Sequence, residues 1–268
     1  MRRAGAATKL AGMPQDTTAP KQRACYVISL RPVGGHASMR RAAAAHGMRV
    51  LALSPWRIEA RDDRATRAAL AEALQADVVL FTSPAAVHAA AALRRLRTRR
   101  EQAWVAVGAG TAAALRRAGV AEVAVPSRMD SEGLLSLPAL QQLRGRSVGM
   151  VTAPGGRGVI APTLAARGAR VRRAEVYARI PVAPSPVALA RLRALDGPAC
   201  LALSSGEALQ RLLQSLPAGL LSRLRQARVL AASQRLAALA RASGFTDIRL
   251  AADARPASLL AAAAAACD

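Results

Sequence analysis

Short polar segments follow five of the expected strands of this chain, and each stands just before an expected helix. A serine or threonine at such a point can cap the helix, while the unpaired backbone N–H groups of the first turn attract anions. Any one of these segments is most simply explained as a helix cap. Five such segments at the same edge of parallel sheets, however, predict a surface that binds a polyanion. The segments are Thr82-Ser83-Pro84-Ala85, Gly108-Ala109-Gly110-Thr111, Thr152-Ala153-Pro154-Gly155-Gly156-Arg157, Ser204-Ser205-Gly206 and Ala232-Ser233.

Two further side chains could take part in chemistry, Tyr177 and Arg157. Tyr177 is one of two tyrosines and ends an expected strand just before a proline-rich segment. A phenol can donate a proton to a leaving hydroxyl group while its ring packs against a flat ligand, and the alternative is a half-buried tyrosine at a hinge. Arg157 follows two glycines at an expected helix start. It could bind a carboxylate through two hydrogen bonds, and its alternative is a solvated arginine in the first turn.

The common catalytic and cofactor motifs are absent from the sequence. Gly108-Ala109-Gly110 lacks the third glycine of a dinucleotide-binding loop, because Ala113 stands at that position, and neither lysine lies in a phosphate-binding loop. The three histidines are scattered, Ser83 and Ser204 are not in a nucleophile elbow, and Asp62-Asp63 reads as a solvated turn rather than a metal site. We therefore expect no dinucleotide-binding loop, no ATP site and no metal site, and an enzyme with this sequence would act through positioning and backbone donors.

The elements that must position these residues alternate between helix and strand. Four times an expected helix ends at a glycine and a short apolar strand begins at once, at Gly47, Gly119, Gly168 and Gly244. Glycine takes the left-handed conformation that closes a helix without steric cost, and an apolar, β-branched run after it is typical of a strand. The alternation predicts an α/β protein with parallel sheets between layers of helices and ligands at the carboxyl ends of the strands.

The strand count suggests two domains and leaves their boundaries open. Two strands are expected before a polar stretch at 57–67, five between that stretch and a proline-dense segment at 180–186, and three after it. One of the middle five is expected at 123–125. The first two and the last three strands could join in one discontinuous domain, which would give two five-stranded sheets. A simple division into an N-terminal and a C-terminal domain is the alternative.

Composition bears on partners. Among 268 residues, 39 are lysine or arginine and 16 are aspartate or glutamate, which gives a formal net charge of +23. Such a charge could serve nucleic-acid binding, but aromatic residues make up only 2% and the spacing of common nucleic-acid-binding motifs does not occur. A small ligand with several carboxylates fits the charge as well. No heptad or apolar stripe predicts a stable partner subunit, so we expect a monomer that does not bind nucleic acid.

The chain ends and the cysteines bear on location. Residues 1–23 are basic and contain no apolar core, so they predict a disordered tail rather than a secretory signal. The apolar run at 259–267 is too short to span a bilayer and predicts a terminal helix. Cys25, Cys200 and Cys267 lack the spacing of a zinc site or of a disulfide framework. These features predict a cytoplasmic protein without a membrane partner.

A set of short segments also occurs in a fixed order along the chain: Leu30-Arg31-Pro32, 81–87, 106–115, 130–135, Gly155-Gly156-Arg157, Val176-Tyr177 and 233–237. In order and spacing this set resembles the uroporphyrinogen-III synthase family, from about residue 26 to the C-terminus. The resemblance implies two flavodoxin-like α/β domains joined by a two-strand connection near 55–59 and 176–182. Domain 1 would be discontinuous, with residues 24–56 and 181–268, and domain 2 would comprise residues 57–180.

The resemblance also implies a reaction. Members of this family close hydroxymethylbilane, a linear tetrapyrrole with eight carboxylates, to uroporphyrinogen III with loss of water and inversion of ring D, and they use no cofactor. Tyr177 falls on the family's cleft tyrosine and would assist departure of the hydroxyl group. The other matched positions would bind the substrate: Arg31, Ser83, Pro84, Ala85, Gly108, Thr111, Gly155, Gly156, Arg157, Ser204, Ser205, Gly206 and Ser233.

One departure from the family pattern and two other functions stand beside this prediction. Gly158 occupies a position where the family commonly carries an acidic residue. A non-catalytic bilobal protein could use the same cleft to sense an anionic ligand. An arginine-rich nucleic-acid-binding protein would bind duplex DNA tightly and with a steep dependence on salt.

Overall fold

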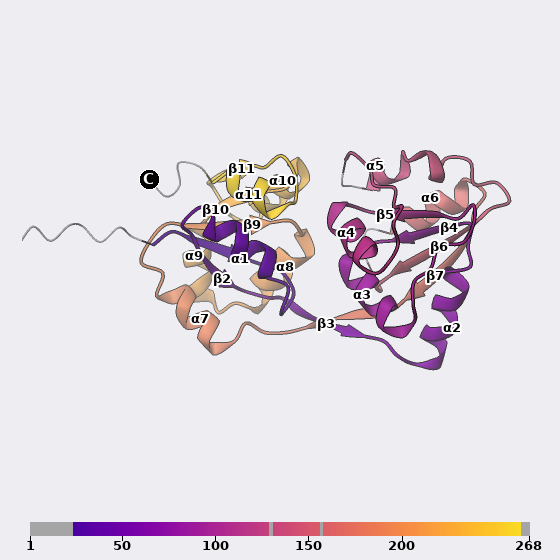
Figure 1. The fold of residues 1–268 in the computed structure, drawn as a ribbon. Helices are drawn as coiled ribbons and strands as arrows, with labels where there is room; N and C mark the ends of the chain where they lie inside the picture. The colour runs from indigo at the N-terminus through magenta and orange to yellow at the C-terminus, as the bar shows by residue number, and fades with distance from the viewer. Residues whose placement is uncertain (1–23, 129–130, 156–157, 264–268) are drawn as a thin grey trace, which may run out of the picture.

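The computed structural model describes residues 24–128, 131–155 and 158–263. The predicted tail at 1–23, the site residues Gly156 and Arg157, and Cys267 lie outside the described residues. The described chain forms two lobes with a narrow two-stranded ribbon between them (Figure 1). Each lobe contains a parallel sheet between helices, as the alternating pattern of the sequence predicts.

Lobe 1 is built on a parallel sheet of five strands in the order β11-β10-β9-β1-β2. Two of these strands precede the ribbon in the sequence and three follow it, and β1 pairs with both β2 and β9. The strands are β1 (Tyr26–Ser29), β2 (Arg49–Ala52), β9 (Ala199–Leu203), β10 (Arg228–Ala231) and β11 (Ile248–Leu250). The helices are α1 (Ala37–Ala44), α7 (Pro186–Arg193), α8 (Gly206–Ser215), α9 (Ala218–Arg225), α10 (Gln234–Ala242) and α11 (Pro256–Ala261).

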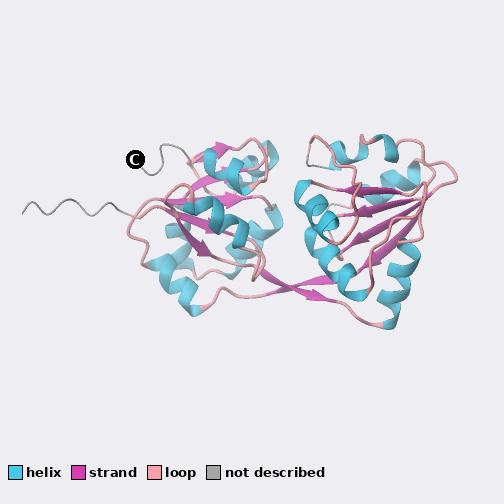
Figure 2. Cartoon of the chain, in the orientation of Figure 1, coloured by secondary structure: helices cyan, strands magenta, loops and turns pink. Residues whose placement is uncertain are grey.

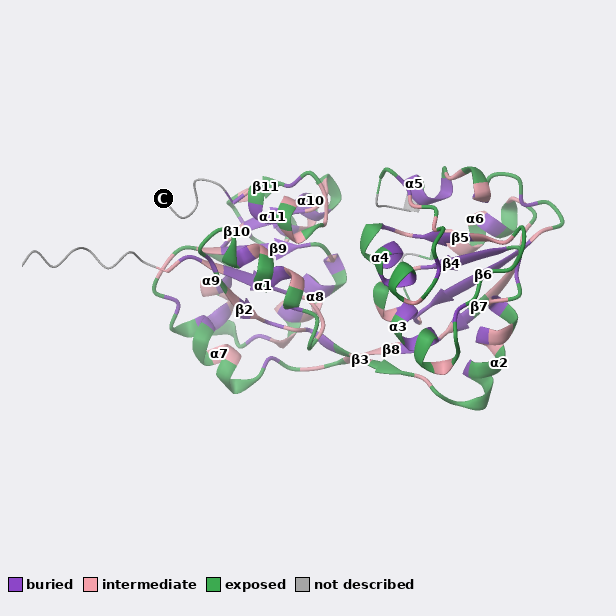
Figure 3. Cartoon of the chain, in the orientation of Figure 1, coloured by how far each residue is buried: buried purple, intermediate pink, exposed green. Residues whose placement is uncertain are grey.

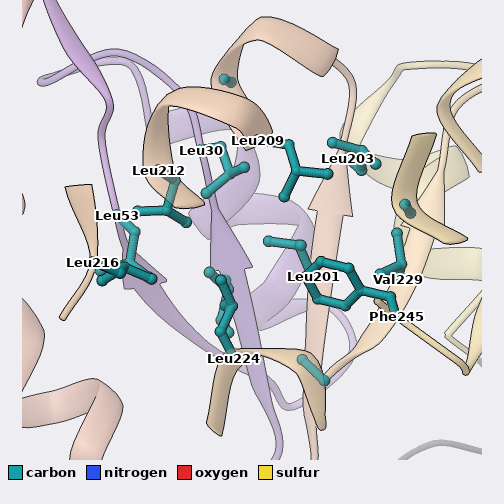
Figure 4. Packing of buried hydrophobic residues seen from close by; sticks show 14 of the residues in the cluster. Leu30, Leu53, Leu201, Leu203, Leu209, Leu212, Leu216, Leu224, Val229 and Phe245 are labelled. Carbon is teal, nitrogen blue, oxygen red and sulfur yellow. The ribbon is translucent and has the colours of Figure 1, made fainter. Parts of the chain in front are cut away.

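Helices cover both faces of this sheet because its central strands are apolar on both sides. Successive side chains of a strand point to opposite faces. Leu201 and Leu203 of β9 therefore pack with Leu209 and Leu212 of α8 on one face (Figure 4). Cys200, which lies next to Leu201 in the sequence, joins a separate cluster with residues of α1 and α11. Burial on two faces is typical of strands in parallel sheets.

Lobe 2 is built on a parallel sheet of four strands in the order β5-β4-β6-β7. Apolar clusters lie on both of its faces. The strands are β4 (Val78–Phe81), β5 (Ala103–Ala106), β6 (Ser147–Thr152) and β7 (Arg170–Glu175). The helices are α2 (Arg64–Ala73), α3 (Pro84–Leu93), α4 (Ala109–Arg117), α5 (Ser131–Leu135), the 3-10 helix η1 (Pro138–Leu140) and α6 (Ile160–Ala166).

The strand expected at 123–125 is wrong. In the structure this segment makes a single bridge, between Val105 and Ala124, instead of a fifth strand of lobe 2. The apolar run is only three residues long, and Pro126 directly after it has no N–H group to extend a ladder. Val123 and Val125 nevertheless pack against the core of lobe 2, which explains their apolar character.

The ribbon between the lobes consists of β3 (Trp56–Ala60) and β8 (Tyr177–Pro181) (Figure 2). The two strands are antiparallel, with Trp56 opposite Pro181 and Ala60 opposite Tyr177. The two-strand connection implied by the resemblance is therefore confirmed. We propose that the domain boundaries follow it, with residues 24–56 and 181–268 in one domain and 57–180 in the other.

Glycines serve two purposes in this fold. Gly47, Gly119, Gly168 and Gly244, predicted to close helices, have φ between +64° and +94°, which confirms the prediction. Gly149 lies in β6, where an added Cβ would lie 1.8 Å from the carbonyl oxygen of Ala73 in α2. The absence of a side chain at Gly149 thus allows the helix to pack directly on the backbone of the strand.

Candidate functional site

The carboxyl ends of the two sheets face the same space. Figure 2 shows the strand arrows of the two lobes pointing toward one another. A pocket of about 560 Å³ lies in this region and receives residues from both lobes. Its lining from lobe 1 follows β9, β10 and β11, and its lining from lobe 2 follows the bridge at Ala124. We call this the inter-lobe pocket; it is lined by Ser127, Arg128, Glu132, Ser204, Ala232, Ser233, Arg235, Leu236 and 252–255.

Positive charge predominates in the inter-lobe pocket. Arg128, Arg235 and Arg255 line it, against the two acids Glu132 and Asp253. Asp253 accepts hydrogen bonds from the backbone N–H and the side chain of Arg255. The Arg255 side chain is the first cause that lowers the pKa of Asp253, to about 2, so this carboxylate is ionised near neutral pH. The guanidinium of Arg255 is thereby held at the rim of the pocket.

The serines after the strands do cap helices, as their positions predict. The hydroxyl groups of Ser83, Ser205 and Ser233 accept hydrogen bonds from backbone N–H groups three residues later, at 3.1, 3.3 and 3.4 Å. These bonds stabilise the first turns of α3, α8 and α10. Ser204 is different, because its neighbour Ser205 makes the cap and Ser204 is exposed in the inter-lobe pocket. Gly206 is the first residue of α8.

Tyr177 and Ser83, both predicted as site residues, are brought together. The Tyr177 hydroxyl oxygen lies 2.9 Å from Ser83 Oγ, although the residues are far apart in the sequence. The ring of Tyr177 packs into the core of lobe 2, and the residue is only 7% exposed. Ser83 thus both caps α3 and holds the phenol at the carboxyl edge of the sheet. Pro84 and Ala85 begin the same helix.

The remaining predicted residues of lobe 2 lie at the same edge. Gly108 is the N-cap of α4, and its φ of −177° is ordinary extended backbone. Thr111, in the first turn of that helix, is 3% exposed and points into the protein. Gly155 follows β6 with a φ of +77°, and the two residues after it are the predicted Gly156 and Arg157, outside the described residues. Gly108 and Thr111 thus follow β5 and Gly155 follows β6, on either side of β4 in the sheet.

Arg31 stands at the corresponding edge of lobe 1 with little solvation. Its Nε is buried and has no hydrogen-bond partner among the described residues. Burial lowers the pKa of Arg31 from its usual value. A buried N–H donor without a partner is costly, and an anion bound there would relieve that cost. Arg31 is thus suited to bind a carboxylate.

His36, which the sequence reading treated only as a scattered histidine, lies next to Arg31 in this region. Its Nδ1 is 3.0 Å from Ser29 Oγ and its Nε2 is 2.8 Å from Ser54 Oγ. Burial is the main cause that lowers the pKa of His36 to about 4, followed by the charges of Arg40 and Arg31. The ring is therefore neutral near pH 7 and ties the ends of β1 and β2 to the start of α1. The signal that could have indicated it is the position of both serines at the ends of apolar strands.

The two described cysteines differ in their bonding. Contrary to expectation, Cys25 is disulfide-bonded, because spacing in the sequence does not limit which cysteines meet in the fold; Cys200 is free and buried. No group of three histidine, cysteine or acidic side chains within the described ranges could hold a metal ion. No helix in the same ranges is both long enough and apolar enough to cross a membrane.

A comparison with known protein families agrees with this architecture. The family model for uroporphyrinogen-III synthase HemD matches residues 37–261. The chain belongs to the uroporphyrinogen-III synthase family. The uroporphyrinogen-III synthases of Salmonella typhimurium and Escherichia coli are 37% and 35% identical to this chain over 150 residues. Each match covers 55% of this chain and 61% of the relative, so the chain spans about three-fifths of the length of the curated relatives that it matches.

Solved structures of the family share the fold. A mutant uroporphyrinogen III synthase from the extremely thermophilic bacterium Thermus thermophilus superposes with a TM-score of 0.58 and 21% identity over 89% of this chain and 96% of that one. Uroporphyrinogen-III synthetase from Helicobacter pylori superposes with a TM-score of 0.56 and 14% sequence identity. That match covers 89% of this chain and 97% of the Helicobacter chain. At such identities the likeness concerns the fold alone, and it confirms the predicted pair of α/β domains. The individual site residues stay predictions.

Proposed function

We propose that this chain is a uroporphyrinogen-III synthase, a cyclising lyase that needs no metal or organic cofactor. It would bind hydroxymethylbilane, release water, and close the ring with inversion of ring D to give uroporphyrinogen III. The observation that carries the proposal is the inter-lobe pocket, which both lobes line with arginines and serines. A polycarboxylate tetrapyrrole is the kind of ligand that such a lining fits.

The carboxylates of the substrate would be bound from both lobes. In lobe 1 the candidates are Arg31, Ser204, Arg235 and Arg255, of which Arg31 has a buried Nε without a partner among the described residues. The backbone N–H groups in the first turns of α3, α4, α8 and α10 would add donors. A side-chain cap satisfies only one of the orphan N–H groups in α3, α8 and α10, and α4 has no side-chain cap. Gly155, Gly156 and Arg157 are further candidates for binding a carboxylate of the substrate.

Tyr177 would donate the proton that the leaving hydroxyl group needs. The carbon–oxygen bond of the hydroxymethyl group would break, and the oxygen would take the phenolic proton and leave as water. An electrophilic azafulvenium cation and the Tyr177 phenolate would remain, and the phenolate would regain a proton from ring D when the macrocycle closes. The substituted carbon of ring D then attacks through a spiro intermediate, which requires that the chain be folded back on itself. Ser83, 2.9 Å from the phenolic oxygen, would orient Tyr177 for this transfer.

The test is to feed hydroxymethylbilane to the purified protein, oxidise the products, and separate the type III and type I uroporphyrin isomers by chromatography. We expect type III in excess. Type I alone, the product of unassisted closure, would refute the synthase activity. If type I appeared together with tight binding of the tetrapyrrole, the result would favour the non-catalytic binding protein.

Two tyrosine variants separate the proton-donor role from the rest of the proposal. Tyr177→Phe should slow cyclisation while binding of the product is preserved. The matched control is Tyr26→Phe, because the Tyr26 hydroxyl bonds to Asp196 at an exposed position of lobe 1. Equal turnover of the two variants would exclude Tyr177 as the donor.

We also propose that the protein acts as a monomer in the cytoplasm and does not bind nucleic acid. The large apolar side chains that are exposed, within the described ranges, are four that lie apart in the sequence: Val33, Val159, Val187 and Leu250. Isolated apolar side chains of this kind do not make an interface. Nanomolar, salt-sensitive binding of duplex DNA at physiological salt would overturn the proposal that the protein does not bind nucleic acid.

A further inference from the structure

Arg179 of β8 contacts both lobes at the ribbon. Its Nη1 donates to Glu207 Oε2 of lobe 1 at 2.9 Å, and its Nη2 donates to the carbonyl oxygen of Pro154 in lobe 2 at 3.4 Å. Its Cζ lies 5.3 Å from the centroid of the Trp56 ring in β3. One guanidinium therefore joins the ribbon to the carboxyl edge of each sheet.

Trp56 and Glu207 hold Arg179 with unequal strength. The ring of Trp56 supports one face of the guanidinium, and such a contact is stronger where water is excluded. The Arg179 side chain is 24% exposed, whereas that of Glu207 is 49% exposed. Ion pairs this open to solvent contribute little net free energy, because solvent screens them. The arginine is therefore fixed in place while its carboxylate partner is easily displaced.

Glu207 does not depend on Arg179 for stabilisation. It lies in the first turn of α8, where the helix dipole favours a negative charge. If another carboxylate took its place on Arg179, Glu207 could turn toward solvent and remain beside this helix end. The exchange would leave neither charge buried and unpaired, so its cost is small.

The guanidinium of Arg179 also approaches bare backbone on the side of lobe 2. Gly155 is next to it, and a Cβ added to that residue would lie 3.7 Å from Arg179 Nη2. Gly155 has a φ of +77°, a conformation that other residues rarely adopt. The glycine therefore places bare backbone, rather than a side chain, beside the guanidinium.

We propose that Arg179 is a carboxylate receptor at the ribbon end of the inter-lobe region, and that Glu207 occupies it until a carboxylate of the ligand replaces it. The inference rests on the proposed function for the identity of the ligand. Glu207 then acts as an internal competitor that keeps the arginine oriented in the empty protein. When the ligand replaces Glu207, the Arg179–Glu207 bond is lost, and with it a direct link between β8 and α8.

The test uses uroporphyrin III as an octacarboxylate probe, with its dissociation constant measured by fluorescence titration of the full chain. Glu207→Gln should tighten binding about two- to fivefold, because it removes the competitor. Arg179→Gln should weaken binding about tenfold or more, the loss of one charged hydrogen bond. In the double variant Glu207→Gln should have no further effect.

A matched control separates this competition from a general change of charge. Glu59→Gln removes the same charge from the ribbon, where Glu59 pairs with Arg57 and both side chains are 55% exposed. It should leave binding unchanged. A purely structural clip predicts instead that Glu207→Gln and Arg179→Gln weaken binding alike, and that result would overturn the receptor. Glu207 is half-exposed, so its variant keeps the test valid even if Arg179→Gln folds poorly.

Failure of the receptor and failure of the proposed function give different results. A wild-type protein that forms the type III isomer and binds uroporphyrin III, but whose Glu207→Gln variant binds no more tightly, would refute the receptor alone. A wild-type protein that neither forms type III nor binds uroporphyrin III would refute both.

Discussion

Protonation of His36 should destabilise the protein in mild acid. The pKa of His36 is about 4 in the folded protein against 6.5 for an ordinary histidine, which we take for the unfolded chain. Between these values the unfolded chain binds more protons, so the free energy of unfolding falls as the pH falls from 6.5 toward 4. At pH 5 the loss amounts to about 2 kcal/mol relative to neutral pH. The groups that face the ring are Ser29, Ser54, Arg31 and Arg40.

The assay is urea denaturation followed by circular dichroism, at about pH 7.5 and about pH 5. His36→Gln should lack the acid-dependent loss, because an amide can bond to both serines but does not titrate in this range. His46→Gln is the matched control, since His46 is exposed, and it should behave as the wild type. If His36→Gln loses as much stability in acid as the wild type does, the reasoning is refuted.

Two predictions concern the elements that carry the site. Gly149→Ala should lower the free energy of unfolding by about 3 kcal/mol, because its Cβ would meet the Ala73 carbonyl oxygen. Gly219→Ala is the control and should leave the free energy of unfolding unchanged, because no atom lies within 4 Å of the added Cβ. Equal urea midpoints for the two variants would contradict this prediction. Ser205→Ala should lower the free energy of unfolding by about 1 kcal/mol through loss of the α8 cap. The adjacent Ser204→Ala is the control and should leave thermal unfolding unchanged. A larger effect at Ser204 than at Ser205 would show that the cap is wrongly assigned.

The secondary structure of this chain is predictable where its signals are local. The four helix-closing glycines and the capping serines act through backbone atoms within a few residues, so the sequence is enough to find them. The ribbon strand β3 has no such local signal, and only the family resemblance indicated it. Four of its five residues are intermediate or exposed (Figure 3), so it has no apolar run, and its pairing with β8 depends on a partner far along the chain.

In the candidate site, too, local signals are predictable from the sequence and contacts between distant residues are not. Sequence marks the serines after strands, but it does not decide that Ser205 caps α8 while Ser204 faces the inter-lobe pocket. That outcome depends on which hydroxyl reaches the N–H group three residues later. Sequence also singles out Tyr177, whereas its contact with Ser83 requires that β8, which leaves lobe 2 directly after β7, pass beside the start of α3.

What the sequence by itself determined is the α/β class, the parallel sheets, and the edge at which polar residues gather, since these follow from alternation and from local caps. Only the tertiary structure decided which distant groups meet: His36 with Ser29 and Ser54, and Arg179 with Glu207. The physical reason is that side-chain hydrogen bonds need their atoms within about 3 Å. Packing of the two lobes and the ribbon sets such distances, and no local pattern of residues specifies them.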